Sequence, residues 1–127
     1  MELTQIQLSQ LGQYQDSVII IKLFTGAELI GKVEHLIPSV SKNQDSMAPA
    51  YAGVVLRKCR EVHAIPQRTQ TGVTMQLSID KPFVTLDPEG LLPIRLEPGI
   101  NCLVYECPSQ LEKGYLETTT GIQLATS

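Results

Sequence analysis

Residues 18–33 read VIIIKLFTGAELIGKV, and this stretch decides the fold class. Its opening run is apolar and β-branched, which predicts a strand over residues 17–24. Apolar side chains fall on both faces of that strand and indicate burial on both sides, by a core and by a neighbouring element. Gly26 lies in the turn that follows, where glycine suits a positive φ. A second strand is expected over residues 29–36, and Gly31 within it predicts a sharp bend or a close backbone approach.

The rest of the chain continues the pattern of short strands. A third strand is expected over residues 54–65, with a bulge near residues 58–60, and Pro66 is expected to end it. Strict alternation over residues 72–79 predicts a half-buried fourth strand. Three more short apolar runs complete the β pattern, at residues 83–86, 93–96 and 100–106.

The C-terminal part differs from the rest of the chain, because its residue pattern predicts a helix rather than a strand. Ser109 and Glu112 have the spacing of a capping box, with Ser109 as the N-cap, and predict a short helix over residues 110–119. A length of 127 residues suits one domain. We expect an N-terminal arm or short helix over residues 1–16 and an all-β domain over residues 17–127 that includes the helix.

The composition excludes several classes of protein. The net charge of −3 argues against a broadly basic surface that coats nucleic acid. The longest apolar run, residues 18–21, is far too short to span a membrane, and residues 1–10 do not resemble a secretion signal, so we expect a cytoplasmic protein. Three cysteines without a CxxC pair predict reduced thiols and no metal site. No cofactor, small-molecule substrate or phosphate-binding glycine loop is indicated.

The candidate functional residues are basic. Arg57, Lys58 and Arg60 form the densest cationic cluster and could hold phosphates, although an exposed face at a strand bend is the simpler interpretation. Lys42 and Asn43, in the long polar loop of residues 37–52, are further candidate nucleic-acid contacts. We interpret His35 and His63 as structural residues, because no serine or cysteine nucleophile accompanies either of them in a motif. We therefore predict no enzymatic activity.

The first hairpin resembles a known family. Leu23, Gly26, Gly31 and Val33 are spaced as in the first Sm motif of Sm, LSm and bacterial Hfq-type proteins. The later part resembles the Sm-like proteins of tailed phages of marine cyanobacteria, through the run at residues 103–106, the short helix and the Thr-Gly-Ile that follows it. Gly26 and Gly31 correspond to the structural glycines of the motif.

The resemblance implies a small, strongly bent five-stranded Sm-like barrel with a short C-terminal helix. It also implies a homo-oligomeric ring of five to seven copies joined through edge strands, and bacterial host cytoplasm as the location. In that family, RNA contacts an Asp-x-x-Asn-type loop after the second strand and an Arg-Gly pair before the last strand. Here the loop is longer and lacks that spacing, and Glu97-Pro98-Gly99 replaces Arg-Gly, so no RNA-contact residue carries over.

Two functions therefore follow from the sequence. One is a non-enzymatic Sm-like oligomer that binds RNA. The other is a structural or protein–protein interaction module with the same barrel and no RNA binding. Because the Arg-Gly pair is missing and the net charge is negative, the sequence does not choose between these two functions.

Overall fold

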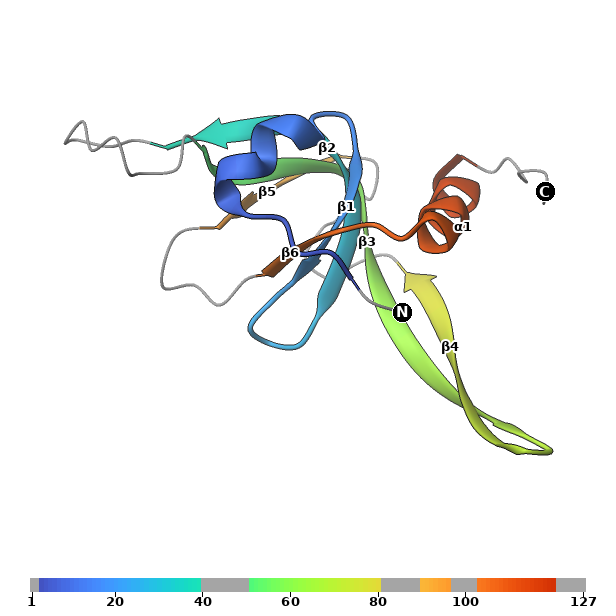
Figure 1. Cartoon of the computed structure of the whole chain (residues 1–127). Helices are drawn as coiled ribbons and strands as arrows, with labels where there is room; N and C mark the ends of the chain where they lie inside the picture. The colour runs from blue at the N-terminus through green and yellow to red at the C-terminus, as the bar shows by residue number, and fades with distance from the viewer. Residues whose placement is uncertain (1–2, 40–50, 81–89, 97–102, 121–127) are drawn as a thin grey trace.

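Six strands, one 3-10 helix and one α-helix make up the described part of the chain, which comprises residues 3–39, 51–80, 90–96 and 103–120 of a computed structural model (Figure 1). The prediction of a mostly β chain with one short C-terminal helix is confirmed. The elements, in chain order, are η1 (Leu8–Tyr14), β1 (Val18–Lys22), β2 (Glu28–Pro38), β3 (Tyr51–Thr69), β4 (Gly72–Asp80), β5 (Leu91–Arg95), β6 (Leu103–Glu106) and α1 (Ser109–Thr120).

All six strands belong to one antiparallel sheet. Its order is β4-β3-β2-β1-β6, and β5 pairs with the first half of β3 while β4 pairs with the second half. The described strands number six rather than the expected five, and they do not close on themselves. The predicted run at residues 83–86 lies outside the described residues.

Both faces of β1 are buried, as the sequence predicts. Ile19 and Ile21 point into a core that collects side chains from η1 and from every strand except β4. Val18 and Ile20 point the other way, into a second cluster that Tyr115 of α1 covers. The neighbouring element expected on the outer face is therefore the C-terminal helix.

Tight backbone geometry joins and bends β2 and β3. Gly26 has a φ of +91° in the turn before β2, a region that side chains with a Cβ rarely adopt. A Cβ at Gly31 would lie 3.1 Å from the Cβ and Cδ1 of Leu56, so β2 passes close to the β3 core here. The expected bulge is found opposite, where the register shifts between Ile30 and Lys32 and Lys58 adopts a φ of +52°.

The second half of β3 and β4 form a long hairpin that projects away from the rest of the sheet (Figure 1). The prediction that Pro66 ends the third strand is wrong, because β3 continues through it to Thr69. Proline can stay in this strand because it lies opposite Met75, at a position whose N–H is not needed by β4. The prediction of a half-buried fourth strand is also wrong for the outer part of β4, which is exposed on both faces.

The N-terminal segment pairs with the far edge of the sheet. The backbone N–H of Ile6 donates to the Val104 carbonyl at 2.8 Å, and the Glu106 N–H donates to the Thr4 carbonyl at 2.8 Å. Ile6 is buried in the first core, as is Leu11 of the η1 helix that follows. Residues 4–6 thus cover the outer edge of β6, and the predicted N-terminal helix is a 3-10 helix behind them.

Helix α1 packs on the outer face of the sheet through Tyr115, Leu111 and Leu116. It begins one residue earlier than predicted. The Glu112 N–H donates to the Pro108 carbonyl at 2.9 Å, so Pro108 takes the N-cap position. The prediction of a capping box with Ser109 as the N-cap is wrong, because Ser109 is the first helical residue and proline has neither the side-chain acceptor nor the N–H that the box needs. No helix among the described residues is both long and apolar enough to cross a membrane.

Candidate nucleic-acid interface

The basic cluster of β3 is split by the bulge. Arg57 is exposed and pairs in register with Lys32 of β2, so the two cationic side chains lie side by side on the outer face of the sheet. Lys58, at the bulge itself, is half-buried. Arg60 is only 3 % exposed and its Nη1 donates to the Cys59 carbonyl at 3.1 Å. Of the three predicted cations, Arg57 therefore faces solvent, Lys58 is partly covered and Arg60 lies inside.

Helix α1 fixes this part of β3. The Tyr115 hydroxyl lies 3.1 Å from the Arg57 carbonyl and 3.0 Å from the Lys58 carbonyl, and it is the donor because a carbonyl can only accept. The Tyr115 hydroxyl has one proton, so the two carbonyls of the bulge share it. The ring of Tyr115 thus locks the bulge whose side chains carry the positive charge.

A hollow of about 180 Å³ lies between the basic side chains and the last turn of α1. It is lined by Lys32, Arg57, Lys58, Tyr115, Leu116, Thr119 and Thr120. Cations at a helix C-terminus interact favourably with the helix dipole, which is one structural role for them. Because Lys32 and Arg57 also reach solvent, the same site can hold a phosphate oxygen at the surface.

Lys32 is absent from the residues predicted for this site, whereas the helix face of Leu111 and Tyr115, which the sequence predicts to pack on the sheet, does so. Nothing in the spacing of the sequence brings Lys32 to Arg57, because their proximity depends on the strand register. Lys42 and Asn43, the other predicted nucleic-acid contacts, lie outside the described residues.

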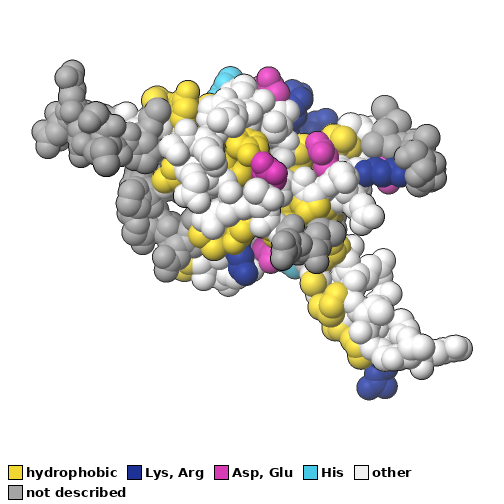
Figure 2. Space-filling view, viewed as in Figure 1, with side chains coloured by type: hydrophobic (Ala, Val, Ile, Leu, Met, Phe, Trp, Pro, Cys, Tyr) yellow, Lys and Arg dark blue, Asp and Glu magenta, His cyan; other side chains and the backbone are white. Residues whose placement is uncertain are grey.

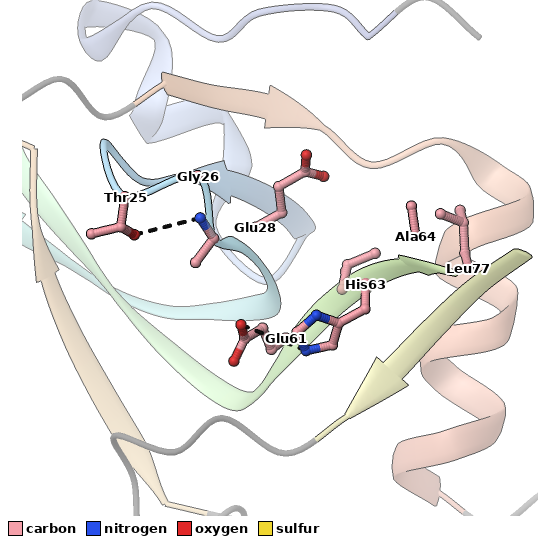
Figure 3. A pocket seen from close by; sticks show the side chains of 9 residues that line it. Thr25, Gly26, Glu28, Glu61, His63, Ala64 and Leu77 are labelled. Carbon is pink, nitrogen blue, oxygen red and sulfur yellow. Dashed lines mark hydrogen bonds and ion pairs between the residues drawn. The ribbon is translucent and has the colours of Figure 1, made fainter. Parts of the chain in front are cut away.

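A second, larger hollow of about 570 Å³ lies where the β1–β2 turn meets the base of the long hairpin (Figure 3). It is lined by Thr25, Gly26, Ala27, Glu28, Glu61, Val62, His63, Ala64 and Leu77. His63 Nε2 lies 3.5 Å from Glu61 Oε1, and the histidine side chain is 46 % exposed. Two glutamates and no lysine or arginine line this hollow, so it repels phosphate and suits cationic or neutral groups.

The described cysteines are poor nucleophiles and poor metal ligands. Burial raises the pKa of the Cys59 thiol to about 12, and burial likewise raises the pKa of the Cys107 thiol to about 12. Both thiols are therefore protonated at neutral pH. Within the ranges that the structure describes, no three His, Cys, Asp or Glu side chains gather where they could hold a metal ion.

Comparisons with protein-family models, with curated proteins and with solved structures find no match for this chain. Its functional assignment therefore depends on its own geometry and on the resemblance of the glycine hairpin.

Proposed function

We propose that this chain is a non-enzymatic, Sm-like protein that associates with copies of itself through sheet edges and contacts RNA phosphates through Lys32, Arg57 and Lys58. The observation that carries the proposal is the strand order, in which the last strand β6 returns beside β1 after a meander through β2 and β3. That order, the close approach of β2 to Leu56 at Gly31 and the helical turn before β1 support the proposal of an Sm-like chain. The resemblance also supports action in the cytoplasm of phage-infected bacteria.

Self-association follows from the unpaired strand edges. Among the described residues, β4 has only β3 as a neighbour, and its other edge presents a row of backbone donors and acceptors. The edge of β6 is already bonded to residues 4–6. A ring of five to seven copies, as the resemblance implies, would need two open edges on each copy. With β6 covered, the strands that have only β3 as a neighbour among the described residues are β4 and β5.

RNA contact is supported by the exposed pair of Lys32 and Arg57 beside the half-buried Lys58. Phosphate contacts by lysine and arginine release counterions, so binding should weaken as salt is raised. We expect short U-rich or A-rich RNA to bind at about 50 mM salt and to bind much more weakly at about 200 mM salt.

The test is a salt series of RNA binding with the double variant Lys32→Gln/Arg57→Gln. Each lost phosphate contact lowers the slope of log affinity against log salt by roughly 0.7 for a single strand, so the expected reduction is about 1.4. The variant Lys22→Gln/Lys113→Gln removes the same charge at positions away from the hollow, and its slope should match the unaltered protein. If the unaltered protein binds no RNA at about 50 mM salt, RNA binding is not its function.

The alternative function, an interaction module without RNA binding, is favoured by a specific observation. The hollow beside the β1–β2 turn carries Glu28 and Glu61, and Arg60 lies in the protein interior rather than at the surface. Self-association in the absence of RNA binding would select this alternative over the first.

A further inference from the structure

The long hairpin carries an exposed apolar stripe. We define the arm as residues 63–79, the part of β3 and β4 beyond Val62. Cross-strand pairing puts Ala64 and Pro66 on the same face as Leu77 and Met75, and the stripe extends to Val73. Val73 is 65 % exposed, Met75 60 % and Leu77 49 %. Figure 2 shows hydrophobic side chains in a line along the arm, with a basic side chain near its tip.

The stripe is continuous with the second core cluster. Val62 and Ile79, at the base of the arm, pack with Tyr115 of α1. Further out, α1 does not cover the stripe, and a hollow of about 210 Å³ remains beside the helix. It is lined by Leu77, Ile79, Gln110, Leu111 and Gly114. The apolar stripe is therefore buried in the second core cluster at the base of the arm and exposed to solvent towards its tip.

The arm also lacks the usual protection of a sheet edge. Residues 69–79 contain no charged side chain, whereas edge strands of monomeric proteins commonly carry lysines or other charges that prevent pairing. A two-stranded ribbon alone is marginally stable in water. Because Pro66 has no N–H and lies opposite Met75, this pair fits the non-hydrogen-bonded kind, so the Met75 N–H points outward.

We propose that β4 pairs with β4 of a second copy of this chain, antiparallel, about a two-fold axis at Gln76. The inference rests on the self-association in the proposed function and specifies its interface. In this register Met75 faces Leu77 of the other copy and Val73 faces its Ile79. Apolar residues then meet apolar residues, and the two stripes join into one across a four-stranded sheet.

The second copy is the favoured occupant because the apolar face of the arm matches itself. Val73, Met75, Leu77 and Ile79 lie on one face of β4, so a two-fold pairing about Gln76 sets each of them opposite an apolar side chain of the other copy. The edge that each copy offers is also free of charge over residues 69–79, so no like charges are brought together there.

Helix α1 completes the fit. In the proposed pairing, Val73 at the tip of one arm lies next to Ile79 of the other copy. Ile79 borders the hollow beside α1, so the apolar tip would fall against the partner's helix at Leu111 and fill that hollow. A foreign strand could pair with the edge, but it would not supply this helix and the hollow beside it.

The first test is the mass of the Met75→Pro variant by light scattering. Proline removes an outward N–H without disturbing a bond inside the hairpin, as Pro66 already shows on the opposite strand. We expect dimer affinity to fall about 10- to 100-fold, because two symmetry-related hydrogen bonds are lost. A circular dichroism melt establishes that the monomer is still folded.

The second test is disulfide trapping in an otherwise unaltered chain. At the proposed axis, two copies of residue 76 form a non-hydrogen-bonded pair with Cα atoms about 4.5 Å apart, within the range of a disulfide. Gln76→Cys should therefore cross-link into a dimer under mild oxidation. The matched control is Gln67→Cys on β3 of the same arm, which should not cross-link, and neither should the protein without an added cysteine.

The outcomes separate this interface from the proposed function. A protein that associates but shows neither the Met75→Pro loss nor the Gln76→Cys cross-link would overturn the arm interface and leave self-association standing. A strictly monomeric protein at high concentration would overturn both. Binding of RNA is measured at Lys32 and Arg57, away from the arm, and is decided independently.

Discussion

At the scale of single residues, Gly31 sets the course of β2. Its Cα lies so close to the Leu56 side chain that an added Cβ would approach it to 3.1 Å. Leu56 is fully buried in the first core and has little room to move aside. The glycine is therefore needed for the passage of β2 over β3, and a ligand role is not required to explain it.

We predict that Gly31→Val destabilises the fold by about 1–3 kcal/mol, because the larger side chain overpacks the contact with Leu56. Urea unfolding followed by circular dichroism measures the loss. The double variant Gly31→Val/Leu56→Ala should lose less than the sum of the two single variants, since each change relieves the other. Strict additivity would show that the close approach does not limit this site.

At the scale of elements, the junction of α1 with the β3 bulge decides where the helix lies. Lys58 adopts a left-handed conformation at the bulge, and the single proton of the Tyr115 hydroxyl is shared between the Arg57 and Lys58 carbonyls. Tyr115 is 1 % exposed, so these hydrogen bonds form away from water. A buried carbonyl without a donor is costly, and the tyrosine therefore couples the helix to the bulge.

We predict that Tyr115→Phe lowers the free energy of unfolding by about 1–2 kcal/mol, because the ring remains and only the hydroxyl donor is lost. Thermal melting measures it. The variant should also weaken RNA binding in the proposed function, since Arg57 and Lys58 lose their fixed backbone.

The control lies next to it in the same helix. A Cβ at Gly114 would meet only the Ile79 Cδ1, at an ordinary distance of 3.7 Å. Gly114→Ala should therefore stabilise the protein by about 1 kcal/mol through helix propensity. A destabilised Gly114→Ala would mean that α1 packs more tightly on β4 than the present geometry implies.

At the scale of the whole molecule, the edges of β6 and β4 at the two ends of the sheet differ in whether another segment bonds to them. Residues 4–6 bond to β6 and close that edge, while β4 at the opposite end projects with its edge unpaired among the described residues. Pairing through β4 about a two-fold axis uses the same edge of both copies, so it closes as a pair while the β6 edge stays covered. The N-terminal segment therefore limits how far assembly can proceed.

We predict that deleting residues 1–6 produces assemblies larger than two copies, because it removes both the Thr4 carbonyl and the Ile6 N–H from β6 and opens that edge. Light scattering over a concentration series measures the mass. Leu3→Ser is the control, since it changes a partly exposed side chain and leaves the backbone bonds in place. An unchanged mass after deletion would show that the β6 edge takes no part in association.

Sequence reasoning located the elements well where side-chain pattern and backbone geometry act locally. The two faces of β1, the positive φ at Gly26 and the bulge near Lys58 follow from apolar alternation and from glycine or bulge chemistry, and all three are found in the structure. It failed at Pro66. A strand can continue through a proline where the neighbouring strand does not need its N–H. Whether that is so at Pro66 depends on the register of β3 against β4.

The sequence by itself determined that this is a β-rich chain with a two-sided first strand, a glycine-bent second strand and a terminal helix, because these features depend on neighbouring residues along the chain. Only the tertiary structure decided that Lys32 lies beside Arg57, that Arg60 is interior, that residues 4–6 cover β6 and that the β3–β4 hairpin projects as an arm. The physical reason is register. Contacts between residues far apart in the chain are fixed by the way whole strands align, and no local pattern records that alignment.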